Sequence, residues 1–156
     1  MKIRNGFVSN SSSSSFVVIG TKCPQRVEWP KDPYTFEDVF VGSVGETEFG
    51  WGPGTCRDVF DRINFAYLQA EIVEEIGNDK PMTMLKEVMR EYTDIKEFKS
   101  CMGDDFEPKE QQVWAYIDHQ SAATEGKNME IFESAHILAQ FLFAPDSEIV
   151  LDHDNH

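Results

Sequence analysis

The chain has 156 residues, 40% of them hydrophobic, and a formal net charge of −14, so it is large enough to bury one core, and a single domain over residues 1–156 is expected. The charge is uneven, because residues 1–31 carry a net charge of +4 and the remaining residues carry −18. An acidic body repels phosphate groups, which makes direct nucleic-acid binding unfavourable. No apolar run has the length that a membrane span or a secretory leader needs.

The strands of the first half are predicted from short apolar runs bounded by glycine and proline. The run that ends at Gly20 indicates a buried strand, and the prolines of residues 21–35 indicate an irregular crossing segment. A tight glycine loop is expected at residues 50–54. The predicted strands are residues 16–19, 39–44 and 47–51, the last two about a turn at Gly45.

Helices are predicted where apolar residues recur at helical spacing. The longest has Thr55 as its N-cap and ends at Gly77. Its apolar stripe consists of Val59, Ile63, Ala66, Ala70 and Val73. The other helices are expected after Asp79, from Asp94 to Gly103, and from Ser134 to Pro145.

The second half of the chain also contains strand patterns. Residues 113–117 and 149–151 are apolar without alternation, which is typical of buried strands, and residues 129–132 are expected to form an edge strand. A polar tail follows at residues 152–156. Strands and helices in separate blocks predict an α+β fold, with a mixed or antiparallel sheet packed by three to four helices.

A serine-rich N-terminal segment, residues 1–15, contains five consecutive serines at positions 11–15 between two apolar runs. Those runs favour burial, so an ordered loop or strand close to another backbone is one interpretation. A disordered arm is a second, and a recognition or modification site is a third. A phosphate cradle near Lys2 and Arg4 would lack the glycines and the lysine of a P-loop.

The stretch Phe-Val-Ser-Asn-Ser-Ser-Ser-Ser-Ser-Phe, starting at Phe7, resembles a signature that opens many bacterial and bacteriophage proteins. One subset of that family is also similar in four later stretches, which are residues 48–51, 63–69, 118–121 and 141–143. The resemblance implies a phage or bacterial accessory protein, located in the cytoplasm of the bacterium or infected cell, with the virion as the alternative. It implies no catalytic role, because the family has no established activity.

Two acidic segments that contain histidine follow predicted buried strands. The first holds Asp118, His119 and Ser121, and the second holds Asp152, His153 and Asp154. If the two strands were neighbours, the histidines and aspartates could bind zinc, manganese or iron. The alternative is two solvated strand ends. A Ser-His-Asp triad within the first segment is excluded, since in a strand His119 and Ser121 stand about 7 Å apart and Asp118 points to the other face.

Three other features are weaker candidates for chemistry. Cys56, at the predicted helix start, could have a lowered pKa but is expected to be a structural thiol. The glycine loop before that helix could favour an anion, although a tight turn is the preferred interpretation. His136 lies in an apolar helical stripe and is expected to be a core or boundary histidine. The three cysteines form no Cys-x-x-Cys pair, which is typical of reduced thiols in the cytoplasm.

The sequence therefore supports three hypotheses about function. The first is a non-enzymatic protein that binds a protein partner, possibly a basic one, through its acidic surface or its N-terminal segment. The second is a small metal-dependent hydrolase, with a divalent cation as the cofactor and His119, His153 and the neighbouring aspartates as its site. The third is an acidic mimic of nucleic acid that inhibits a nucleic-acid-binding protein. No strong catalytic motif is present, which favours the first.

Overall fold

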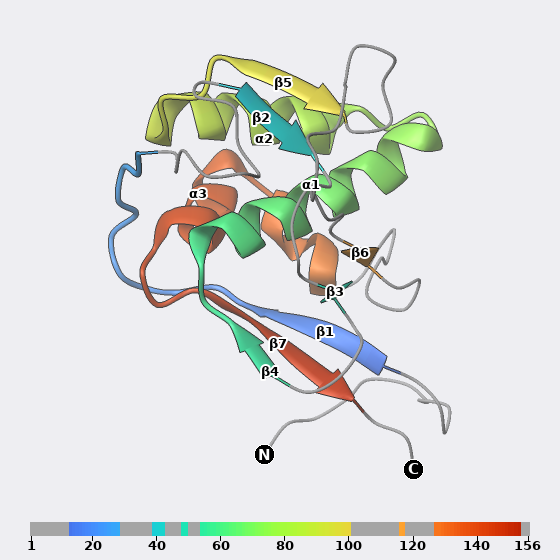
Figure 1. Cartoon of the computed structure of the whole chain (residues 1–156), viewed down its shortest axis with the longest axis vertical. Helices are drawn as coiled ribbons and strands as arrows, with labels where there is room; N and C mark the ends of the chain where they lie inside the picture. The colour runs from blue at the N-terminus through green and yellow to red at the C-terminus, as the bar shows by residue number, and fades with distance from the viewer. Residues whose placement is uncertain are drawn as a thin grey trace, which may run out of the picture.

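A three-stranded antiparallel sheet lies against one side of a group of helices in the computed structural model (Figure 1), which describes residues 13–28, 39–42, 48–49, 54–100, 116–117 and 127–153. The fold class is α+β, as predicted. The helices are α1 (Val59–Glu75), α2 (Lys80–Tyr92), the 3-10 helix η1 (Lys127–Phe132) and α3 (Ala135–Phe143). The strands are β1 (Ser13–Val18), β2 (Val39–Gly42), β3 (Glu48–Phe49), β4 (Gly54–Cys56), β5 (Glu97–Ser100), β6 (Tyr116–Ile117) and β7 (Glu148–His153).

Strand β7 is the central strand of the three-stranded sheet. Both neighbours run antiparallel to it, and the register pairs Ile149 with Val17 of β1 on one side and with Cys56 of β4 on the other. The first and last strands of the chain are therefore adjacent. The predicted strands at residues 16–19 and 149–151 are confirmed, and β1 extends the first of them into the serine tract.

The remaining strands form two parallel pairs, β2 with β5 and β3 with β6. The predicted strands at residues 39–44 and 47–51 thus contain β2 and β3. β2 and β3 are not paired with each other, because each pairs with a strand much later in the chain, and the turn predicted at Gly45 lies outside the described residues. Of the strand predicted at residues 113–117, the structure describes Tyr116 and Ile117, and the other positions lie outside the described residues.

Helix α1 is the centre of the hydrophobic core. All nine residues from Arg62 to Ala70 are buried, so this middle part of the helix is enclosed on every side and not along one stripe as the spacing predicted. Its neighbours α2, α3 and η1 supply most of the rest of the core, where Phe65 of α1 meets Phe141 of α3 edge to face with ring centroids 6.2 Å apart.

The N-cap of α1 is not the predicted residue, whereas the glycine that follows its C-terminal end is the predicted one. Thr55 lies in β4, and Asp58 is the N-cap, with its carboxylate accepting a hydrogen bond from Phe60 N at 2.7 Å. Gly77 has a φ of 97°, which only glycine adopts readily, and Asn78 N donates to Val73 O at 2.9 Å. Helix α1 therefore begins later than predicted and ends at the predicted glycine.

The structure confirms two more helices and corrects two short elements. Helix α2 follows Asp79, and the side chain of Ser134 caps α3 by accepting from Ile137 N at 3.1 Å. The helix predicted from Asp94 to Gly103 is wrong, because this segment contains β5, which pairs with β2. The edge strand predicted at residues 129–132 is also wrong, since these residues belong to η1 and bury Ile131 in the core. Both corrections arise from tertiary contacts that override local preference.

Candidate functional site

The structure brings the serine tract and the C-terminal Asp-His segment together. In the register of β1 with β7, the Cα partners are Ser13 with His153, Ser14 with Asp152, and Ser15 with Leu151. One sheet thus contains both Ser13–Ser15, from the serine-rich segment predicted at residues 1–15, and Asp152 and His153, from the polar tail predicted at residues 152–156. The interpretation of the tract as a strand beside another backbone holds for Ser13–Ser15.

The same pairing excludes a phosphate cradle built on these three serines. A cradle needs successive backbone N–H groups that converge on one anion, whereas the N–H groups of an antiparallel strand alternate in direction. Ser13–Ser15 have the second arrangement. Lys2 and Arg4, which the cradle would have used, lie outside the described residues.

The metal hypothesis assumed that the strands before the two Asp-His segments are neighbours. β6, which precedes Asp118, pairs with β3, and β7 is paired on both of its edges by β1 and β4. The residues Asp118, His119, Ser121 and Asp154 lie outside the described residues. The described part of the chain contains no group of three or more histidine, cysteine or acidic residues placed to hold a metal ion. A site that includes the undescribed residues stays a prediction.

Cys56 has the properties of a structural thiol and not of a nucleophile. Burial, together with the smaller effects of the negative charges of Asp61 and Asp58, raises the pKa of Cys56 to about 11. The lowered pKa considered for a cysteine at a helix start is therefore wrong. The helix start itself carries the carboxylate of Asp58, which takes the place that an anion would use. His136 was expected at a core or boundary position, and the structure places it on the exposed side of α3.

A dense polar junction joins the segment after β1 to the turn between α3 and β7. The carboxylate of Asp146 accepts hydrogen bonds from Thr21 N at 2.9 Å, Thr21 Oγ1 at 3.4 Å and Lys22 N at 3.1 Å. The bond from the Thr21 backbone is the main reason why the pKa of Asp146 lies below its usual value, and the bond from Lys22 N acts in the same direction.

Neighbouring side chains complete the junction from the other side. Gly20 N donates to Ser147 Oγ at 2.8 Å, and Ser147 Oγ donates to Gln140 O at 2.6 Å. Gln140 Nε2 donates to the carbonyl oxygens of Gly20 and Lys22, at 2.9 Å and 3.1 Å. A Cβ atom at Gly20 would overlap the Asp146 carboxylate, so this close approach requires glycine.

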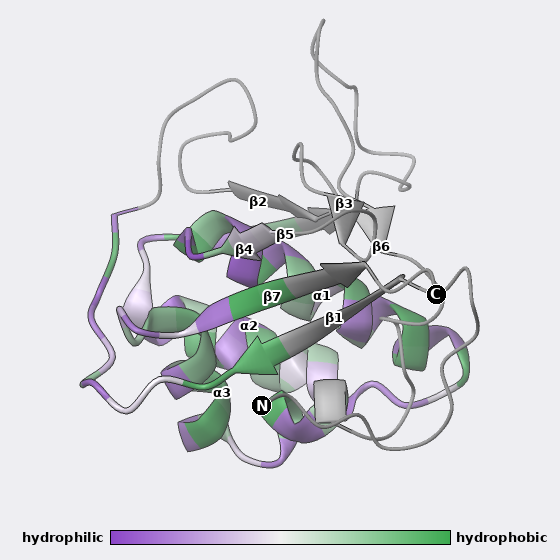
Figure 2. Ribbon diagram, turned by 90° about the horizontal axis from the view of Figure 1, so that it is seen from below, coloured by the Kyte–Doolittle hydropathy of each residue, from purple (hydrophilic) through white to green (hydrophobic). Residues whose placement is uncertain are grey.

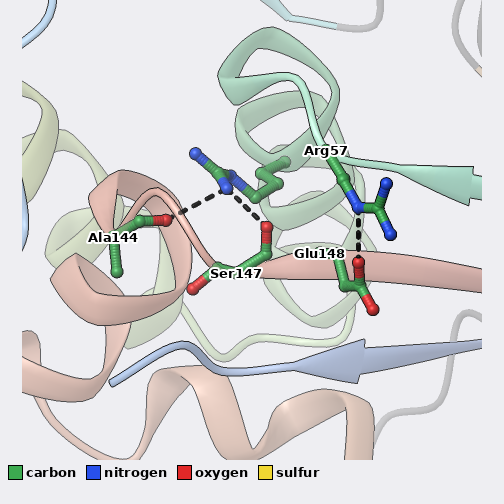
Figure 3. Close-up of polar contacts among 5 residues, drawn as sticks. Arg57, Ala144, Ser147 and Glu148 are labelled. Carbon is green, nitrogen blue, oxygen red and sulfur yellow. Dashed lines mark hydrogen bonds and ion pairs between the residues drawn. The ribbon is translucent and has the colours of Figure 1, made fainter. Parts of the chain in front are cut away.

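A buried arginine of α1 supports the same turn (Figure 3). Arg62 is 4% exposed, and its Nη1 donates to Ser147 O at 2.6 Å and Ala144 O at 3.1 Å. Burial lowers the pKa of Arg62, and the carboxylates of Asp58 and Asp146 oppose that shift. Nearer the surface, Arg57 Nε pairs with Glu148 Oε2 at 2.8 Å. Arg62 donates its hydrogen bonds to backbone carbonyl oxygens of the turn, so its role is to hold the turn in place.

This junction was missed by the sequence reasoning. Its polar residues are Arg62, Gln140, Asp146 and Ser147, and each meets a group far away in the chain, for instance Gly20 and Ser147 across 127 positions. The available signals were an arginine within an apolar helical run and the turn-forming Pro145-Asp146-Ser147 after a helix. The junction fixes β1 to the helices, and its polar groups make the hydrogen bonds of that attachment.

Comparisons of the chain with protein-family models, with curated proteins and with solved structures gave no match. Among the described helices, none combines the length and hydropathy required to cross a bilayer.

Proposed function

We propose that this protein is a non-enzymatic accessory protein of phage or bacterial origin that binds a protein partner with a basic surface. The observation that carries the proposal is the charge, since the residues after position 31 have a net charge of −18. Such a field raises the rate of encounter with a basic partner and disfavours acidic ones. Exposed carboxylates of the helical part contribute to it, among them Glu74, Glu75, Asp79, Glu87 and Glu91.

The attachment of the N-terminal strand supports the acidic body as the contact surface, in preference to a free N-terminal arm. Ser13–Val18 pair with β7, and Gly20, Thr21 and Lys22 are bound by the junction at Asp146. A segment fixed at this many points presents its surface as part of the folded domain. Binding would then require little ordering of the chain.

The experiment that tests this proposal is capture from a bacterial lysate on the immobilised full-length chain. Elution with NaCl rising from about 0.1 M to about 1 M should release basic proteins, because salt screens the attraction. An unrelated acidic protein of similar size and charge, immobilised at equal density, is the control for ion exchange. Failure to retain any protein above that control would contradict the proposal.

The same experiment separates the acidic-mimic form of the hypothesis from simple protein binding. A captured nucleic-acid-binding protein that duplex DNA displaces from the column would have its phosphate-binding groove occupied by this chain. A captured protein that resists displacement by DNA, yet elutes with salt, would bind the acidic surface in another way.

A further inference from the structure

The segment that follows β1 crosses the C-terminal ends of two helices. Gln25 N donates to the carbonyl oxygen of Phe143, the last residue of α3, at 3.0 Å. Val27 N donates to the carbonyl oxygen of Tyr92, the last residue of α2, at 2.8 Å. The last carbonyl groups of a helix have no partner within the helix. Residues 19–28 therefore supply hydrogen-bond donors that both helices need at these ends.

An arginine and a pair of aromatic rings strengthen this bridge. Arg26 Nη1 donates to Glu91 O at 2.9 Å, which places a positive charge beside the C-terminal end of α2. A cation is favourable there, because the helix dipole leaves partial negative charge at this end. The rings of Tyr92 and Phe143 stack with their centroids 5.0 Å apart, so α2 and α3 meet at the ends that the segment bridges.

Hydrogen bonds, more than apolar burial, hold this segment in place. Of residues 17–28, Gly20 alone is buried, and the hydrogen bonds of Thr21, Lys22 and Arg26 lie at the surface. Figure 2 shows the segment leaving the arrowhead of β1 and running along the outside of the helices, with hydrophilic residues predominating. A segment with few buried apolar side chains and exposed hydrogen bonds opens at a lower cost in free energy than a core does.

One turn holds both this segment and the start of the central strand. Asp146 and Ser147 bind the backbone of residues 20–22, and β7 begins at the next residue, Glu148, which is the register partner of Val18. Release of the segment from this turn therefore also removes support from the pairing of β1 with β7. Among the described strands, β1 pairs with β7 alone.

We propose that residues 13–28, which we call the latch segment, open and close as one unit over the folded helices. In the closed state, which is the state of this structure, β1 pairs with β7 and the segment covers the C-terminal ends of α2 and α3. In the open state these contacts are broken together, while the core around α1 stays folded. The latch segment thereby controls whether the edge of β7 beside β1 is available to another strand. Binding of a basic partner needs no opening, so this inference goes beyond the proposed function and does not rest on it.

Native-state amide hydrogen exchange, followed by NMR on the full-length chain in low concentrations of urea, measures this opening. The amides of Gly20, Gln25 and Val27 should share one free energy of opening, which should be lower than that of the amides in the buried middle of α1. The backbone amides of β1 that donate to β7 should share it too. Separate opening free energies along the latch segment, or equal values for the latch segment and α1, would overturn the proposal.

Two variants perturb the latch segment at different places. Asp146→Asn weakens the bonds at the turn and should speed exchange about tenfold, by the same factor at Val27 as at Gly20. Arg26→Gln removes a bond at the end of α2 and should speed exchange about threefold, again equally at both amides. Asp79→Asn is the matched control and should change these rates less than about twofold, because Asp79 is exposed and its side chain makes no capping hydrogen bond. Acceleration confined to the amides nearest each substitution would show independent local openings and would contradict the proposal.

Discussion

Asp146 holds the segment that directly follows the N-terminal strand β1. Its carboxylate accepts two backbone N–H groups and one hydroxyl from Thr21 and Lys22. These bonds favour the charged form, which is why the pKa of Asp146 lies below the ordinary value of 3.8. The stabilisation they provide is therefore fully present above pH 3.8 and is lost as the pH falls through the lower folded-state pKa.

Asp146→Asn should destabilise the protein near pH 7, and the difference from wild type should shrink as the pH falls below about 4. The amide keeps one acceptor oxygen but loses the charge that strengthens the bonds. Urea unfolding at a series of pH values between about 7 and 3 measures the difference in the free energy of unfolding. Glu87→Gln, on an exposed position of α2, is the control for loss of one negative charge. A difference that is constant over this pH range would show that the carboxylate charge is not what holds the strand.

The two described cysteines should react at very different rates. Cys23 is exposed, whereas Cys56 is partly buried with its pKa raised to about 11. Because the thiolate is the reacting form, iodoacetamide at about pH 8 should label Cys23 well before Cys56. Peptide mapping by mass spectrometry follows each site separately, and labelling in urea shows that Cys56 reacts once unfolded. Labelling of Cys56 as fast as Cys23 in the folded protein would contradict the structural role given to this thiol.

Residue identities alone could not have predicted the junction around Asp146. Arg62, Gln140 and Asp146 are ordinary residues of a helix or a turn until the fold brings Gly20 to them. The opposite is true of the candidate histidines, because the sequence shows which residues could bind a metal but does not show where the fold places them. His153 is placed at a register position beside Ser13, and His119 lies outside the described residues.

At the scale of elements, Ser134 provides the clearest link between sequence and stability. Its hydroxyl accepts the Ile137 N–H and begins the helix that carries Phe141 and Leu142 into the core. Ser134→Ala should lower the free energy of unfolding by about 1 kcal/mol, measured by urea denaturation. Ser134→Asp restores an N-cap acceptor and should keep most of the stability. Equal loss in both variants would mean that the hydroxyl has a role other than capping.

Elements specified by local signals were predictable, and those specified by distant partners were not. Helix α3 has its own cap, and α1 ends at a glycine with a positive φ, so both left clear marks in the sequence. β5 was predicted as a helix because its strand conformation depends on pairing with β2. β4 was hidden in a glycine loop for the same reason, since it exists through its pairing with β7.

At the scale of the whole molecule, burial of apolar residues and net charge have opposite effects on the stability of the fold. The core encloses the middle of α1 on every side, which stabilises the fold, while the excess negative charges of a chain with a net charge of −14 repel one another across the surface. The exposed ion pair between Arg57 and Glu148 is the kind of contact that contributes little to stability. Screening by salt should therefore relieve more repulsion than it removes attraction.

Raising NaCl from about 0.01 M to about 0.15 M should raise the melting temperature, because the screening length falls from about 30 Å to about 8 Å. Differential scanning fluorimetry measures the change, and KCl at equal ionic strength shows whether the effect depends on the ion. The double variant Glu74→Gln/Glu75→Gln removes two exposed negative charges at the C-terminal end of α1. This variant should melt higher than wild type at low salt and respond less to added salt, since negative charge at a helix C-terminus is unfavourable. A melting temperature that stays level or falls with salt would show that self-repulsion does not limit stability, and would weaken the argument that this acidic surface is maintained for a basic partner.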